Sequence, residues 1–304
     1  NNTYSGTGTR THAYTTAGTY NVSLNGQATR IAFYGTGATP TLLKDILTKM
    51  SDGLTGITSG DSMFRGCTGI TTFTEPDFFD DVSGNVTNMA NMFQDATSFN
   101  QPLNNWNTSK VTNMVSMFNG ATSFNQPLND WDTSSVTNME NMFYRATSFN
   151  QPLNNWNTSK VTTMAYMFRG ASSFNQSLNS WNTSSVTDMR GVFYYASSFN
   201  QDISNWNVSS LTTATGMFDG VTLPTVVYDG ILIKWSNQTL KTGVTISFGN
   251  SKYDNGLPLE SKNKIASNFT WTITDGGSTG NTYIEHKKVK YNTKSTAKVK
   301  IKNI

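Results

Sequence analysis

The sequence predicts an α/β repeat solenoid, in which each 25-residue unit supplies a short helix and a short extended arm, flanked by small β-rich terminal segments. Tryptophan recurs at a constant step of 25 residues from Trp106 to Trp206. Two phenylalanine columns keep the same step, one from Phe93 to Phe218 and the other from Phe99 to Phe199. Self-similarity at a fixed period is the sequence signature of a repeat protein, so these columns predict the architecture.

The first half of each unit is expected to be helical. Its apolar residues follow spacings of three, three, one and three, as in Val111, Met114, Met117, Phe118 and Ala121. Such spacings place them on one stripe of an amphipathic helix, and the hydroxyls of Thr108 and Ser109 precede it as candidate N-caps. The second half contains Pro127 and Leu128 among Asn and Asp residues, which favours an extended or turn segment. A unit this small cannot bury its apolar face alone, so the units are expected to stack.

The flanking segments carry different patterns. Before the repeats, Tyr14–Leu24 alternates as a β-hairpin, Thr41–Met50 has the pattern of a short helix, and Met63-Phe64 followed by Cys67 echoes the core of one unit. After them, strands are expected at 244–248 and 271–274, a helix at 259–268, and a helix or strand at 228–235. The chain is therefore divided into an incomplete β segment (1–38), an N-terminal cap with a degenerate repeat (39–82), five to six 25-residue repeats (83–222), a C-terminal capping region (223–280) and a Lys-rich β tail (281–304).

The net charge of +3 hides two unlike parts. Residues 281–304 contain seven Lys and one Glu, so the remainder of the chain is slightly acidic. In the tail, Lys298, Lys300 and Lys302 alternate with other residues, which predicts a strand with a cationic face. Nucleic acid is not expected as a partner, because the Arg residues of the repeats are scattered and the repeats are not basic.

Several functional classes find no support in the sequence. No apolar run is long enough to span a bilayer, and the single cysteine, Cys67, cannot form a disulfide framework or a Cys-based zinc site. The two histidines, His12 and His286, lie in no nucleophile motif, and no nucleotide-binding loop is present. No enzyme activity and no cofactor are therefore expected. The acidic cluster Glu75, Asp77, Asp80 and Asp81 could bind calcium, but it lacks the glycine spacing of a calcium loop, so a solvated acidic loop is the favoured interpretation.

A candidate partner surface emerges from comparing the units with one another. Some columns vary while the core stays fixed, and these columns lie off the apolar stripe, so they are expected to face solvent. In the later units they hold the residue types that dominate interface hot spots. The candidate partner-binding residues are Tyr144, Arg145, Tyr166, Arg169, Arg190, Tyr194 and Tyr195. Ordinary variation on an exposed face remains the alternative.

Asparagines also recur in register. One column follows the second phenylalanine of each unit and contains Asn100, Asn125, Asn150, Asn175 and Asn200. An internal ladder of side-chain amides that satisfies backbone groups is the favoured interpretation, and a row that binds a ligand is the alternative. The Asn-x-Ser/Thr triplets at Asn107, Asn157, Asn182 and Asn207 match glycosylation acceptors but equally suit local turn chemistry.

The unit from Asn141 to Trp156, with its Met-Phe, Phe-Asn-Gln and Trp positions, resembles the BspA-type leucine-rich-repeat surface proteins of bacteria over residues 83–222. The stretch Tyr228–Gly277 looks like the segment that closes such leucine-rich-repeat-like arrays. Thr11-His12-Ala13-Tyr14 with Ala17–Val22 is similar to the last strands of a polycystic-kidney-disease (PKD) domain, whose earlier strands are missing. The resemblance implies an extracellular protein on a cell or virion surface that attaches to a protein or glycan on another surface, without catalytic residues.

The two ends of the chain support a second hypothesis. The N-terminal β segment lacks strands, and the tail strand Lys294–Ile304 has no evident partner. Strand donation from one subunit to the next would join them through backbone hydrogen bonds. The alternative function is therefore a structural subunit of an extracellular filament or of a phage particle.

Overall fold

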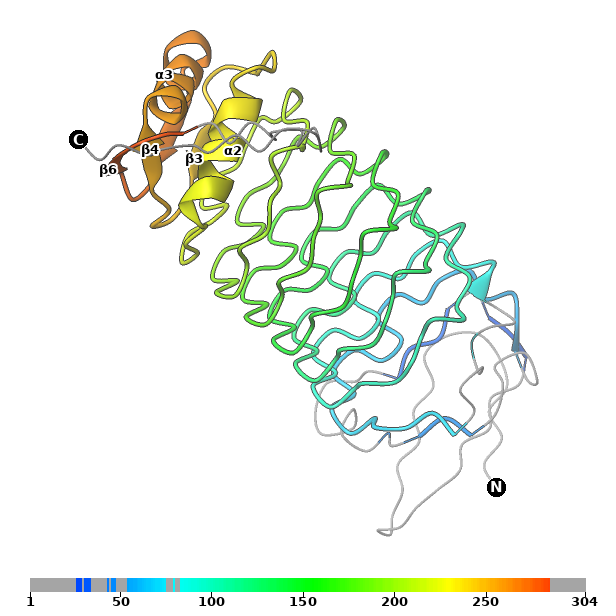
Figure 1. The fold of residues 1–304 in the computed structure, drawn as a ribbon. Coiled ribbons are helices and arrows are strands. Elements are labelled where there is room, and N and C mark those ends of the chain that lie inside the picture. The colour runs from blue at the N-terminus through cyan, green and yellow to red at the C-terminus, as the bar shows by residue number, and fades with distance from the viewer. Residues whose placement is uncertain are drawn as a thin grey trace, which may run out of the picture.

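The computed structural model describes residues 26–28, 30–33, 43, 45–47, 54–74, 79 and 83–284. In this part of the chain the repeats form a row of similar coils, and the helices gather at its C-terminal end (Figure 1). The hairpin expected at Tyr14–Leu24, the acidic cluster at 75–81 and the strand Lys294–Ile304 lie outside the described residues. Of the helix expected at Thr41–Met50, the described residues Leu43 and Asp45–Leu47 are not helical, and Asp45 accepts a hydrogen bond from the Thr74 N–H (2.7 Å) instead.

Regular elements are short and lie mainly at the ends of the described chain. The elements are β1 (Gly26–Gln27), β2 (Leu54–Thr55), α2 (Thr225–Trp235), β3 (Thr245–Ser247), β4 (Tyr253–Asn255), α3 (Leu257–Phe269), β5 (Thr272–Thr274) and β6 (Ser278–Thr282). β1 pairs with β2, β3 with β5 and β4 with β6, all in parallel. Between β2 and α2 the repeats are joined by single parallel bridges, which connect Ser59, Asn88, Asn113, Asn138, Thr163, Asp188 and Thr213 in sequence.

The helix predicted in each repeat is wrong. No described residue from 86 to 224 lies in a helix, and the stretch from Met114 to Ala121 is a run of turns. Half of its N–H groups donate to the next repeat, as in Ser116 to Glu140 O (2.8 Å) and Phe118 to Met142 O (2.9 Å). Of the intervening N–H groups, those of Met117, Asn119 and Ala121 donate three residues back, as in Asn119 to Ser116 O (3.1 Å), and that of Val115 donates to Oδ1 of Asn113 (3.1 Å). We name this stretch, in every repeat, the turn row.

Left-handed residues explain why the turn row does not continue as a helix. Two positions in each turn row have positive φ, such as Ser116 (54°) and Gly120 (71°). A left-handed residue at every fourth position redirects the N–H groups outward to the neighbouring repeat. Across the repeats these positions mostly hold Gly, Asn, Asp or Ser, and Gly, Asn and Asp are the residues that best tolerate this conformation.

The core consists of aromatic columns that run along the row of repeats. Phe118, Phe143 and Phe168 stack with ring centroids 5.6 and 5.5 Å apart and nearly parallel planes. The second column runs beside the first, with Phe149 4.0 Å from Phe143. Each buried tryptophan from Trp131 to Trp206 donates its indole N–H to a leucine carbonyl of the preceding repeat, as in Trp156 to Leu128 (2.8 Å). The aromatic columns therefore hold the side chains of neighbouring repeats in register. The hydrogen bonds of the turn rows do the same for the backbone.

Both ends of the row extend the same stacking. On the N-terminal side Phe64 stacks on Phe93 at 5.3 Å, and Phe64 and Cys67 are fully buried. On the C-terminal side Phe248 stacks on Phe218 at 5.3 Å, and the Phe218 N–H donates to Ser247 O in β3 (3.1 Å). α2 and α3 then cover the end of the row (Figure 1). The capping region thus continues the ladder before it closes it.

A glycine permits this closure. Gly249 has a φ of 59°, and a methyl carbon there would overlap the carbonyl oxygens of Val221 and Phe218. Gly243 has a similar φ of 76° but open space around it.

Gly249→Ala is expected to destabilise the protein by about 2–4 kcal/mol, since the backbone around the new methyl group must move. Gly243→Ala should cost only the left-handed strain, about 1–2 kcal/mol. Thermal and urea unfolding of the two variants measures the difference, and equal losses would contradict this account.

A buried carboxyl in α2 makes the capping region sensitive to pH. Asp229 is 1% exposed, and burial raises its pKa from 3.8 to about 6, although it accepts a hydrogen bond from the Asp254 N–H (3.0 Å). The folded state therefore holds the proton more tightly than the unfolded chain. Its contribution to stability is fully present below pH of about 4 and is lost as the pH rises to about 6.

Asp229→Asn mimics the protonated carboxyl and removes this dependence. The variant should match the wild type near pH 4 and exceed its stability above pH 6 by about 3 kcal/mol, which is the size of a two-unit shift. Melting temperatures from pH 4 to pH 7 measure the effect. Parallel curves for the two proteins would show that Asp229 does not titrate in this range.

Candidate functional site

The turn rows place the candidate residues on successive rungs of one face. Tyr144-Arg145, Arg169-Gly170 and Tyr194-Tyr195 occupy the same two positions in three consecutive repeats. Backbone hydrogen bonds hold these rungs together, from Arg145 N–H to Arg169 O (2.7 Å) and from Gly170 N–H to Tyr194 O (2.8 Å). Side chains that are 25 residues apart in the sequence are therefore neighbours in space.

All seven candidate residues belong to one connected network. The Arg169 guanidinium lies 4.6 Å from the Tyr194 ring and 5.3 Å from the Tyr144 ring. Arg145 lies over Tyr144, Arg190 over Tyr166, and Tyr166 also contacts Arg169. Tyr195 meets Tyr194 edge to face at 4.7 Å. We name these seven residues the Tyr/Arg face; cation–π contacts of this kind hold an arginine in place without neutralising its charge.

Three members of the Tyr/Arg face stand in unfavourable backbone. Arg145, Tyr166 and Tyr195 have φ values of 54°, 57° and 55°. The same columns hold Asn, Asp, Ser or Gly in the other repeats. A bulky residue in left-handed backbone costs about 1–2 kcal/mol, and such strain clusters at functional sites. Tyr195 is also 59% exposed, so burial does not compensate for its strain.

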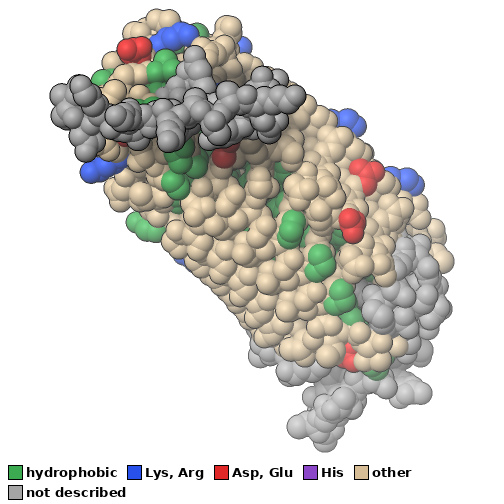
Figure 2. Space-filling view, viewed as in Figure 1, with side chains coloured by type: hydrophobic (Ala, Val, Ile, Leu, Met, Phe, Trp, Pro, Cys, Tyr) green, Lys and Arg blue, Asp and Glu red, His purple; other side chains and the backbone are tan. Residues whose placement is uncertain are grey.

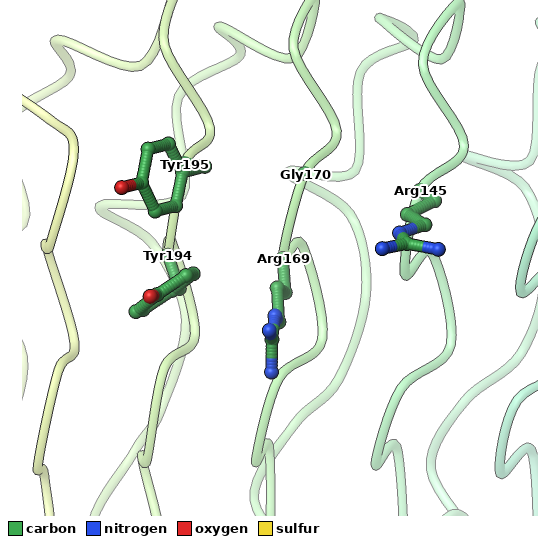
Figure 3. A pocket seen from close by; sticks show the side chains of 5 residues that line it. All are labelled: Arg145, Arg169, Gly170, Tyr194 and Tyr195. Carbon is green, nitrogen blue, oxygen red and sulfur yellow. The ribbon is translucent and has the colours of Figure 1, made fainter.

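A hollow opens in the Tyr/Arg face. It has a volume of about 310 Å³ and is lined by Arg145, Arg169, Gly170, Tyr194 and Tyr195 (Figure 3). Gly170 lies between Arg145 of the preceding repeat and Tyr195 of the following one, and it contributes no side chain. Sequence reasoning missed Gly170. The signal was available, because its column alternates between a larger residue and glycine: Asp95, Gly120, Arg145, Gly170, Tyr195 and Gly220.

The arginines of the face differ in their charge partners. Arg190 forms an ion pair with Asp188 (2.7 Å), and hydrogen bonding to that carboxylate raises the pKa of Arg190. Within the described part of the chain, Arg145 and Arg169 form no ion pair. Figure 2 shows one face of the molecule, which consists mainly of uncharged polar side chains and backbone, with a line of separate hydrophobic side chains along the repeats and isolated charges. The hollow therefore combines two unneutralised cations with aromatic walls.

The asparagine column is an internal ladder. The Oδ1 atom of Asn150 accepts hydrogen bonds from the Asn175 N–H (2.9 Å) and from Nε2 of Gln176 (3.0 Å). The same two contacts recur in earlier units, where Oδ1 of Asn100 accepts from the Asn125 N–H and from Nε2 of Gln126, and Oδ1 of Asn125 accepts from the next Asn and Gln in the same way. The amide oxygens are thus engaged with the protein itself, as expected for the favoured interpretation of this column.

The Asn-x-Ser triplets serve local turns. At Asn107, Asn157, Asn182 and Asn207, Oδ1 accepts hydrogen bonds from the N–H and the hydroxyl of the serine two residues later, at 3.0–3.1 and 2.7 Å. Asp132 accepts the same N–H contact from Ser134 (2.9 Å). The side-chain oxygens of these triplets therefore stabilise the bend that joins consecutive repeats.

The described residues offer no metal site, no reactive thiol and no membrane-spanning helix. No three His, Cys, Asp or Glu side chains among them are grouped closely enough to hold a metal ion. Burial raises the pKa of the Cys67 thiol to about 12, so it is not a thiolate at neutral pH. No helix in this part of the chain is long and apolar enough to cross a membrane. His12, His286 and the acidic cluster Glu75, Asp77, Asp80 and Asp81 lie outside the described residues.

These features define a repeat protein whose turns stack in parallel register. The family described as "Mycoplasma protein of unknown function, DUF285" matches residues 58–160 and 129–226, which together span more than half of the chain, and the chain belongs to this family. No curated protein and no solved structure matches the chain. The family match agrees with the BspA-type resemblance, whereas the PKD-like segment lies outside both the match and the described residues.

The asparagine ladder makes a testable contribution to stability. Asn150→Leu removes the acceptor for Asn175 N–H and Gln176 Nε2, so it should destabilise the protein by about 1–3 kcal/mol and lower its melting temperature. Asn150→Asp keeps the acceptor oxygen and should lose clearly less. Differential scanning calorimetry of both variants measures this. If Asn150→Leu left the melting temperature unchanged, the column would be free for a role in ligand binding.

Proposed function

We propose that this protein attaches to a protein or glycan on another surface through its Tyr/Arg face, and that it carries out no reaction. One observation carries the proposal: seven Tyr and Arg residues gather on one face of the repeats, although three of them occupy backbone that favours Gly or Asn. Extracellular display, on a cell or virion surface, belongs to the same proposal and rests on the BspA-type resemblance.

The composition of the face suits recognition. Tyr and Arg are enriched among the few residues that supply most of the binding energy at protein interfaces. Here Tyr144, Arg169 and Tyr194 are half-buried against one another, so binding would immobilise few free rotamers. Pre-ordering of this kind improves affinity because less conformational entropy is lost on association.

The lining of the hollow favours binding over catalysis. It consists of Arg, Gly and Tyr residues. General acid–base catalysis usually relies on a histidine or carboxyl group within hydrogen-bond reach of the substrate. Arginine and tyrosine instead supply charge, hydrogen bonds and flat apolar area, which are the elements of a recognition surface.

The alternative function, a filament or phage subunit assembled by strand donation, depends on Lys294–Ile304. That segment lies outside the described residues, so the Tyr/Arg face carries the proposal. Nucleic acid is not proposed as a partner, since the two unpaired arginines of the hollow form a local site and not an extended basic stripe.

The triple variant Tyr144→Ala, Arg169→Ala and Tyr194→Ala tests the face. We expect the wild type to bind a subset of spots on arrays of extracellular-matrix proteins and glycans. The variant should lose at least about tenfold in affinity for those spots, because it removes three adjacent hot-spot side chains. Surface plasmon resonance on the identified spots gives the dissociation constants.

The same column supplies the matched control. Gln94→Ala with Asn119→Ala changes equivalent positions on the two repeats before the face, and it should leave binding intact. Circular dichroism and melting temperature must show that each variant is folded. Retained binding by a folded triple variant would contradict the proposal, as would equal losses in the control.

A further inference from the structure

The hollow above Gly170 differs from the equivalent places in the neighbouring repeats. At Gly220 a methyl carbon would lie 2.7 Å from the Tyr195 ring, and at Gly120 it would overlap the Asp95 carboxylate. The preceding repeat thus fills the space over both of these glycines. At Gly170 the nearest atom would be Cγ of Arg145, at 3.4 Å, which is an ordinary contact. Room is therefore left over Gly170 that its counterparts do not have.

Two cations border this room. Arg145 and Arg169 come from consecutive repeats, and neither forms an ion pair within the described chain. The Arg169 guanidinium is fixed between the rings of Tyr144 and Tyr194, at 5.3 and 4.6 Å. A guanidinium presents its N–H groups in a rigid fork that matches the two oxygens of a carboxylate. The hollow therefore offers a fixed receptor for one carboxylate group.

An aromatic wall stands beside the cations. Tyr195 is 59% exposed, and its ring meets Tyr194 at an angle of 62° with centroids 4.7 Å apart. The contact with Tyr194 thus fixes the orientation of the Tyr195 ring, while much of that ring remains exposed to solvent. An exposed aromatic face of this kind packs against the flat C–H face of a sugar ring and offers a phenolic hydroxyl to sugar hydroxyls.

The size of the hollow limits the ligand. Its volume of about 310 Å³ lies at the lower end of ordinary ligand sites. One ring with a carboxylate fits such a volume, whereas an extended chain would pass over it. Since Arg190 is neutralised by Asp188, a second anionic group is not favoured on that side.

We propose that this hollow binds a single acidic sugar residue, with its carboxylate on Arg145 and Arg169 and its ring against Tyr195. This assignment rests on the proposed attachment function and narrows its ligand to a carboxylated glycan. Gly170 is a specificity-determining position, because any side chain there occupies the space of the sugar ring.

Isothermal titration calorimetry on the full chain tests the assignment. The probes are the methyl glycosides of glucuronic, galacturonic and N-acetylneuraminic acids, with methyl glucoside as the ring without a carboxylate and acetate as the carboxylate without a ring. At least one acidic sugar should bind about tenfold more tightly than either control, because methyl glucoside lacks the charge-assisted hydrogen bonds and acetate lacks the ring that packs against Tyr195. Binding should weaken as salt concentration rises.

Matched variants distinguish the contributions of arginine charge and of free space over Gly170 to sugar binding from a general effect on folding. Arg145→Gln and Arg169→Gln should each weaken the acidic sugar about tenfold, since each removes one charged donor. Gly170→Asn should abolish binding while the fold survives, because Asn tolerates the φ of 68° at this position, as Asn141 does at 55°. Lys160→Gln removes the same charge from an exposed site in the same repeats and should change nothing.

Two results would overturn the inference without touching the attachment function. The first is failure of all three acidic sugars to bind better than methyl glucoside, while the triple variant still loses its array spots. The second is array binding confined to acidic peptides or proteins and competed by none of the sugars. Conversely, sugar binding at the hollow together with array binding that survives the triple variant would support the inference and contradict the wider face.

Discussion

Backbone hydrogen bonding from one repeat to the next is the constraint on which the structure depends. In the turn rows between Met89 and Tyr195, alternate N–H groups donate to carbonyls 24 residues later, as in Ser116 to Glu140 and Phe118 to Met142. A shift of one residue would pair the wrong groups and turn buried phenylalanines outward. The period of 25 is therefore enforced by backbone and core together. An array of this kind has unpaired groups at its ends, which is why β3 accepts the Phe218 N–H and β5 in turn accepts the Phe248 N–H.

The same constraint separates the parts of the sequence that must be conserved between repeats from those that are free to differ. Aromatic columns such as Phe118, Phe143 and Phe168 stack only if every repeat supplies the ring. The outer positions of the turn row satisfy their backbone groups whatever side chain they carry, because their N–H groups donate to backbone carbonyls or, as at Val115 and Arg190, to the side-chain oxygen two residues earlier. Neighbouring repeats therefore bring unlike residues into a row at fixed spacing, and Tyr144, Arg169 and Tyr194 form such a row.

Much of this could be predicted from the sequence, and the failures have physical causes. The period, the buried columns and the seven residues of the Tyr/Arg face followed from residue identity at a fixed step. The helix did not, because a stripe such as Val111, Met114 and Met117 also fits successive three-residue turns, and only the left-handed residues distinguish the two. Their signal is faint, since Ser116 and Asn141 are ordinary in a helix or a turn. Gly170 was missed because a cavity arises from what its neighbours leave open, and single residue types do not show that.

The position of the strain connects the scaffold to recognition. Positive φ at Arg145, Tyr166 and Tyr195 would destabilise an isolated turn, but each turn here is held on both sides by neighbouring repeats. A repeat array spreads such a local cost over contacts that are already in place, because each repeat depends mainly on its neighbours. At these positions, a residue in left-handed backbone directs its side chain over the following repeat, as Tyr166 lies over Gly191 and Tyr195 lies over Gly220. Side chains from separate repeats thus meet across the rungs, and the contact of Arg145 and Tyr195 with the space above Gly170 follows from the backbone that the ladder imposes.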